Sequence, residues 1–86
     1  MTAARASAYG NVTALLRELG PAKLTQSEQE RIREAADELI FAASLDGVRH
    51  VVRDVGELGR HLEATGRWSP PRARRLVATV RACGPA

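Results

Sequence analysis

The chain has 86 residues, a net charge of +3 and one cysteine, Cys83. This length fits one small domain, and a single cysteine excludes a disulfide within the chain. Cys83 has no Cys or His companion at metal-ligand spacing, so we expect a reduced thiol and no metal site. The mild positive charge permits contact with nucleic acid or with an acidic protein and requires neither.

The sequence shows no feature that directs a protein to or across a membrane. Residues 1–13 lack the continuous apolar core of a secretory signal. No run approaches the roughly 18 apolar residues of a membrane span. We therefore expect a cytoplasmic protein without membrane contact, with residues 1–86 in a single α-helical domain. Because a domain of this size buries only about 60% of its unfolded surface, association with a second copy as a homodimer is a further expectation.

The first helix is expected over residues 11–19, because its apolar residues share one face. Residues 1–10 are alanine-rich but end in Gly10, so we expect a flexible or frayed segment there. Gly20 and Pro21 are predicted to end the helix, since glycine takes the left-handed closing position and proline blocks continuation. The apolar face consists of Val12, Leu15, Leu16 and Leu19.

The second helix, expected over residues 25–44, carries the strongest signals in the chain. Thr25 is a good N-cap, and Glu28 three residues later completes a capping box. At roughly 100° per residue, Phe41 and Leu45 fall on the side opposite the apolar stripe. The end of the helix is therefore apolar nearly all round, and it needs cover from its own fold or from a partner. The apolar stripe consists of Ile32, Ala35, Ala36, Leu39 and Ala43.

The third helix is expected over residues 47–65, after a break at Asp46 and Gly47. Its narrow apolar stripe is typical of a seam inside a bundle. Gly59 lies within the stripe and predicts a close approach by a neighbouring backbone, whereas Gly56 sits to one side without an evident reason. The stripe consists of Val48, Val51, Val52, Val55, Leu58 and Leu62.

The fourth helix is expected over residues 70–83. Ser69 as N-cap and Pro70 in the first turn mark its start, and Trp68 is predicted to fold over Ala73 as a hydrophobic staple. No stretch has the alternating pattern of a β-strand. The sequence therefore predicts an all-α fold, a small antiparallel four-helix bundle with the second and third helices as its central hairpin.

No group of residues predicts catalysis, a cofactor or a small-molecule substrate. Glu34, Asp37 and Glu38 lie on the side of the second helix away from its apolar stripe, where a carboxylate in water has no reason to act as an acid or a base. His50 and His61 are eleven residues apart, about 16 Å along a helix, and cannot share a metal. We therefore expect a protein that is not an enzyme.

The remaining signal is an excess of large apolar side chains. Phe41, Leu45 and Trp68 have no place in a bundle with one apolar stripe per helix, and Tyr9 is a candidate neighbour. Either the N-terminal segment covers them, or they form a docking patch, because contiguous exposed apolar groups usually mark an interaction site. The preferred hypothesis is a non-catalytic interaction module, an adaptor, regulator or inhibitor, that binds a protein partner or a second copy of itself.

The alternative hypothesis is a regulator that binds DNA or RNA. The turn at Gly66 resembles that of a helix-turn-helix, although Arg72 stands where an apolar residue should pack. The same arginines would equally complement an acidic protein partner. The arginines that surround the start and the outer face of the fourth helix are Arg67, Arg72, Arg74, Arg75 and Arg81.

Overall fold

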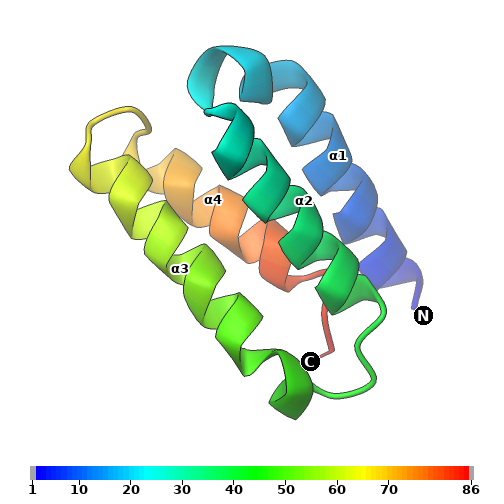
Figure 1. The fold of residues 1–86 in the computed structure, drawn as a ribbon. Helices are drawn as coiled ribbons and strands as arrows, with labels where there is room; N and C mark the ends of the chain where they lie inside the picture. Colours follow the sequence, from blue (N-terminus) through cyan, green and yellow to red (C-terminus); the bar gives the residue numbers. More distant parts are fainter. Residues whose placement is uncertain (1, 86) are drawn as a thin grey trace.

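The computed structural model describes residues 2–85, which form four α-helices and one short 3₁₀-helix. The α-helices are α1 (Ala3–Lys23), α2 (Gln26–Ile40), α3 (Arg49–Ala64) and α4 (Pro70–Arg81), and the 3₁₀-helix η1 (Leu45–Val48) leads into α3. Consecutive helices lie antiparallel, and α1 and α2 also pack against α4, so the helices close into a bundle (Figure 1). The predicted all-α four-helix bundle is confirmed.

The first helix begins at Ala3 and includes most of residues 1–10, the stretch that the sequence predicted to fray. Thr2 caps it, because the Thr2 hydroxyl accepts a hydrogen bond from the backbone N–H of Arg5 at 3.2 Å. Gly10 lies inside the helix and faces open space. Packing of the buried side of α1 against the bundle therefore outweighs the low helix propensity of this glycine.

Gly20 and Pro21, which were predicted to end the first helix, lie inside its last turn. Gly20 instead serves packing: a Cβ there would come within 2.9 Å of Gln29 Oε1. Gln29 Nε2 also donates a hydrogen bond to the Gly20 carbonyl at 3.2 Å. Pro21 removes only one backbone hydrogen bond close to the end of the helix, and α1 stops at its C-cap, Leu24.

The second helix begins with the predicted capping box. Thr25 Oγ1 accepts a hydrogen bond from the Glu28 N–H at 3.1 Å, and Glu28 Oε1 accepts one from the Thr25 N–H at 2.8 Å. The helix ends at Ile40, four residues before the predicted end, and Phe41 is its C-cap residue. Phe41 and Leu45 therefore lie outside α2, Phe41 at its C-cap and Leu45 at the start of η1.

The third and fourth helices lie close to their predicted positions. α3 begins at Arg49, since η1 occupies the residues just before it. Gly66 has a φ angle of 73°, in the left-handed region that favours glycine, and reverses the chain after α3. α4 begins at Pro70 as predicted, but the side chain of Ser69 makes no capping hydrogen bond.

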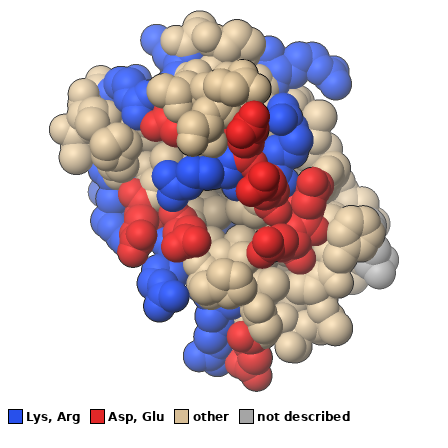
Figure 2. All heavy atoms as spheres, in the orientation of Figure 1, with Lys and Arg blue, Asp and Glu red and all other residues tan. Residues whose placement is uncertain are grey.

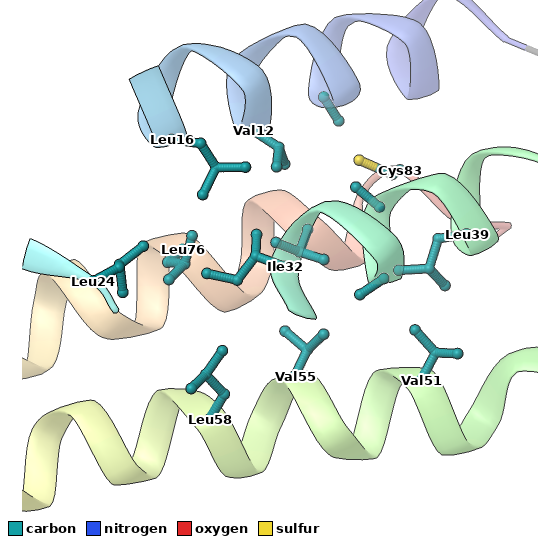
Figure 3. Close-up of a cluster of buried hydrophobic side chains, with 14 of the residues drawn as sticks. Val12, Leu16, Leu24, Ile32, Leu39, Val51, Val55, Leu58, Leu76 and Cys83 are labelled. Carbon is teal, nitrogen blue, oxygen red and sulfur yellow. The ribbon is translucent and has the colours of Figure 1, made fainter. Parts of the chain in front are cut away.

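The core lies between the four helices and is filled by aliphatic side chains (Figure 3). The close approach predicted at Gly59 is found: a Cβ there would lie 2.5 Å from Val77 Cγ2 of α4. Within residues 2–85, no helix is both long enough and apolar enough to cross a membrane. The buried side chains labelled in Figure 3 include Val12, Leu16, Ile32, Leu39, Val51, Val55, Leu58 and Leu76.

Candidate functional site

Two large apolar side chains are exposed among residues 2–85, and both lie in the connection between α2 and α3. Phe41 is 80% exposed and Leu45 is 38% exposed. Ile40, the residue before Phe41, is buried. The chain therefore passes directly from a buried aliphatic residue to an exposed aromatic one.

The backbone around Phe41 is held by Arg5, which reaches it from the first turns of α1. Arg5 Nη2 donates hydrogen bonds to the carbonyl oxygens of Leu39 at 2.6 Å, Ile40 at 3.1 Å and Ala42 at 3.0 Å. The last carbonyls of a helix have no partner within that helix, and a cation beside them also meets the negative end of the helix dipole. Arg5 thus acts as a cap for α2 that comes from another helix.

Arg5 also joins the two ends of the described chain. Its Nε donates to the Cys83 carbonyl at 2.9 Å, so one guanidinium holds the end of α2 and the segment after α4. Sequence reasoning did not assign any role to Arg5. That a helix end needs donors is predictable, but no local pattern shows which distant arginine supplies them.

Phe41 stands between two carbonyls, those of Ile40 and Ala42, that Arg5 holds in place. Its backbone is therefore fixed on both sides while its side chain points away from the fold. An exposed aromatic residue on an ordered backbone loses little conformational freedom when it binds. This geometry suits an anchor for a partner better than a mobile loop would.

Tyr9 is half-buried, and its hydroxyl donates a hydrogen bond to the Asp37 carboxylate. This hydrogen bond, together with burial, raises the pKa of Tyr9. Tyr9 also lines a groove between α1 and α2, beside Val12 and Leu16. Tyr9 thus takes part in the contact between these two helices, and its hydroxyl is already occupied.

Trp68 is buried, with 5% of its surface exposed, and does not contribute to an exposed patch in this structure. Its indole Nε1 donates a hydrogen bond to the Lys23 carbonyl at 3.1 Å. Trp68 therefore attaches the turn between α3 and α4 to the end of α1. Of the three residues of the predicted docking patch, only Phe41 and Leu45 are exposed in the structure.

Arg67 is also tied to the fold. Its two terminal nitrogens donate to the two carboxylate oxygens of Glu28, at 2.9 and 2.5 Å. The hydrogen bonds from Arg67 are the main reason why the pKa of Glu28 is lowered to about 2, while burial of Glu28 acts in the opposite direction. The guanidinium of Arg67 is therefore already paired at close range. Arg74 has a longer contact of 3.7 Å with Glu63, and Arg72, Arg75 and Arg81 form no ion pair within residues 2–85.

The arginines of α4 are divided between two sides of the helix. Arg74 and Arg81 line a groove between α3 and α4, whereas Arg72 and Arg75 are exposed outside this groove. Figures 1 and 3 show α3 and α4 lying alongside each other, whereas the two helices of a helix-turn-helix meet at about 90–120°. Any contact with nucleic acid would thus depend on the arginines alone.

Acidic side chains gather over α2 and α3 on the face shown in Figure 2. Glu34, Glu38 and Asp54 line a cleft of about 150 Å³ together with His50, whose Nε2 lies 3.9 Å from Glu38 Oε2. Both members of this pair are more than half exposed, so water weakens their attraction. Within residues 2–85, no three His, Cys, Asp or Glu side chains are placed to hold a metal ion.

Cys83 lies in the core, and burial raises the pKa of its thiol. A thiol with a raised pKa forms little of the reactive thiolate. Cys83 therefore adds no reactive group to the candidate site, which consists of the exposed Phe41 and Leu45. Comparison of the chain with protein-family models, with curated proteins and with solved structures found no match.

Proposed function

We propose that the protein is a non-catalytic interaction module, an adaptor, regulator or inhibitor in the cytoplasm. In this proposal it binds a protein partner, or a second copy of itself in a homodimer, through the loop that carries Phe41. The observation that supports it is the 80% exposure of Phe41 on a backbone that Arg5 holds on both sides. Leu45, four residues later, adds a second partly exposed apolar side chain.

The energetics of this loop suit an anchor. Burying an aromatic side chain such as Phe41 contributes about 1.5–3 kcal/mol to association. Ordering a mobile loop would oppose that gain, and the hydrogen bonds from Arg5 lower this cost because they hold the backbone before binding. A few such residues dominate many interfaces, while charged residues around them set the choice of partner.

The proposal is tested with Phe41→Ser and a matched control, Ala43→Ser, which changes an exposed residue of the same loop. Sedimentation velocity over a concentration series measures self-association, and pull-down from the native host measures partner binding. We expect Phe41→Ser to weaken association about tenfold or more, a loss of roughly 1.4 kcal/mol, and Ala43→Ser to behave as wild type. The proposal is wrong if folded Phe41→Ser keeps both the self-association and the partners of the wild type.

A second candidate function is binding of DNA or RNA by Arg72, Arg74 and Arg75. All three are exposed, and neither Arg72 nor Arg75 forms an ion pair within residues 2–85. Reversal of the three charges should abolish binding together with its steep salt dependence. Binding assays with DNA and RNA at low salt decide the matter, and the absence of measurable binding to either would end this candidate.

A further inference from the structure

The groove between α3 and α4 is a second surface, apart from the loop at Phe41. It has a volume of about 560 Å³ and is open to solvent. Its lining includes small residues from both helices, Gly56 and Gly59 of α3 and Ala78 of α4, with half-buried Val77 beside them. Helices approach each other most closely where the side chains at the contact are small. At Gly59 the two helices already meet through Val77, so the accessible floor of the groove is formed by Gly56, Val77 and Ala78, whose small side chains let the side chains of a further helix come close.

Positive charge borders this groove. Arg60 comes from α3, and Arg74 and Arg81 come from α4, against one acidic residue, Glu63. Glu63 Oε1 lies 3.7 Å from Arg74 Nε, but the Arg74 side chain is still 78% exposed. Arg60 and Arg81 form no ion pair within the part of the chain that the structure describes. The groove thus carries more positive charge than its own residues balance, which suits an acidic ligand.

We propose that the α3–α4 groove binds an acidic amphipathic helix of a partner protein. Arg74 and Arg81 are seven residues apart on α4, two helical turns or about 10 Å along the axis. Two carboxylates seven residues apart on a partner helix have the same spacing, so each pairs with one arginine. The apolar side of that helix then rests on Gly56, Val77 and Ala78, as in other helix-in-groove complexes.

The lining of the groove favours a helix over a nucleic acid. Proteins that bind single strands commonly stack bases on aromatic side chains. No aromatic residue lines this groove, and the three aromatic residues of the chain, Tyr9, Phe41 and Trp68, lie elsewhere. Arginine alone would attract phosphate, but a floor of glycine, alanine and valine offers no stacking platform. This inference rests on the proposed role as an interaction module, but it uses a different surface.

Charge reversal in the full-length chain is the first test. Arg74→Glu combined with Arg81→Glu reverses the charge at the groove. Arg72→Glu combined with Arg75→Glu is the matched control, because it changes the net charge equally outside the groove. Circular dichroism and thermal melts check that each variant is folded, and Arg74→Gln with Arg81→Gln replaces the reversal if the reversal unfolds the chain.

Filling the groove is the second test, independent of charge. In Gly56→Leu, the new Cβ meets only Arg60 Nη1, at the ordinary contact distance of 3.6 Å. Leucine is also a better helix former than glycine, so the fold should accept this change. The new side chain would then occupy the place of the partner helix without altering any arginine.

The probe is a fluorescent helical peptide of about 18 residues, five turns, with glutamates seven residues apart beside an alanine and leucine face. Its control peptide has lysine in place of every glutamate, and a single-stranded DNA oligonucleotide is the third ligand. Fluorescence anisotropy at low salt measures all three. We expect the glutamate peptide to bind wild type and Phe41→Ser equally, and the lysine peptide not to bind.

The variants should differ clearly in their affinity for the glutamate peptide. Binding of the glutamate peptide should weaken about tenfold or more in the groove reversal and in Gly56→Leu, and should stay unchanged in the control with Arg72 and Arg75 reversed. No binding by the wild type, or an equal loss in the control, overturns the proposal. The proposal is also overturned if the chain binds the oligonucleotide but not the peptide, and if this binding is lost on charge reversal and kept in Gly56→Leu. That result would assign the arginines to nucleic acid. If the peptide fails while Phe41→Ser still loses association, the groove proposal falls and the proposed function stands.

Discussion

Arg67 and Glu28, 39 positions apart in the chain, form a two-pronged ion pair with N–O distances of 2.9 and 2.5 Å. Glu28 accepts the backbone N–H of Thr25 at the same time, so its carboxylate closes the capping box of α2 and receives the guanidinium. The turn before α4 is thereby fixed to the first turn of α2. The Glu28 side chain is 10% exposed and that of Arg67 is 34% exposed, so water and salt weaken this pair less than a fully exposed one.

Arg67→Ala should lower the melting temperature at neutral pH and make stability less sensitive to acid. The pKa of Glu28 falls from its ordinary value of 4.5 to about 2 on folding. The stability linked to this shift is fully present above pH 4.5 and is lost as the pH falls through about 2. The difference in melting temperature between wild type and Arg67→Ala should therefore disappear as the pH falls through this range.

Thermal melts followed by circular dichroism at a series of pH values measure the gap. Arg72→Ala is the control, since Arg72 is exposed and forms no ion pair within residues 2–85. It should follow the wild type at every pH. A gap of constant size down to pH 2 would show that the Arg67–Glu28 pair does not cause the difference.

Arg5→Ala should destabilise the fold by about 2 kcal/mol, because it removes four hydrogen bonds from a charged donor to backbone carbonyls. Water can replace part of this bonding at the end of α2, which limits the loss. Urea unfolding measures the change, and Arg17→Ala, an exposed arginine of the same helix, should alter stability by less than about 0.5 kcal/mol.

Amide hydrogen exchange around Phe41 should also speed up in Arg5→Ala, since the connection after α2 loses its support. The readout is local and separates the loop from the rest of the fold. If exchange at residues 41–45 and global stability both match the wild type, Arg5 does not order this loop, and the preorganisation of Phe41 needs another cause.

Two glycines of α3 should respond in opposite directions to alanine. In Gly56→Ala the new Cβ meets only Arg60 Nη1, at the ordinary contact distance of 3.6 Å, so the change should stabilise the protein by up to about 1 kcal/mol through helix propensity. Gly59→Ala places a Cβ 2.5 Å from Val77 Cγ2, and the stiff valine side chain cannot turn away easily. Strain of about 1–3 kcal/mol should outweigh the gain in propensity.

Denaturant unfolding of both variants tests this pair. Val77→Ala in the Gly59→Ala background should recover stability relative to the sum of the two single changes, because it removes the clashing methyl group. Additive effects in this double-mutant cycle would mean that the two helices separate to avoid the clash.

Trp68→Phe should destabilise the protein by about 1–2 kcal/mol, since it keeps an aromatic ring but leaves the Lys23 carbonyl without the indole donor. Trp68→Ala should cost more, about 3–5 kcal/mol, because it also opens a cavity. Guanidinium unfolding measures both. Stability of Trp68→Phe equal to that of the wild type would show that the hydrogen bond contributes nothing and that only the ring matters.

The sequence predicted helix ends correctly at positions where local signals and the packing between helices favour the same residue. The capping box of Thr25 and Glu28 and the start at Pro70 are local signals, and both appear in the structure. The end of α1 was predicted too early, because the packing of Gln29 against Gly20 is a contact between helices. Signals within a few residues cannot reveal such contacts.

The sequence predicted less of the candidate site than of the fold. Arg67 and Trp68 are neighbours in sequence and were predicted to belong to a basic surface and to a docking patch. In the structure both attach the turn before α4 to the region where α1 ends and α2 begins. Their partners, Glu28 and Lys23, lie some 40 positions away. The pattern did indicate that Phe41 needs cover, and the described part of the fold leaves it 80% exposed.

The hydrogen bond from Arg5 to the Cys83 carbonyl spans 78 positions and sets an order of events in the cell. A ribosome produces residue 5 long before residue 83, so this bond forms only after residue 83 has left the ribosome. The three other hydrogen bonds of Arg5 join α1 to the end of α2 and need no residue after Ala42. Of the four hydrogen bonds of Arg5, the one that ties α1 to the segment after α4 is therefore the last that can form.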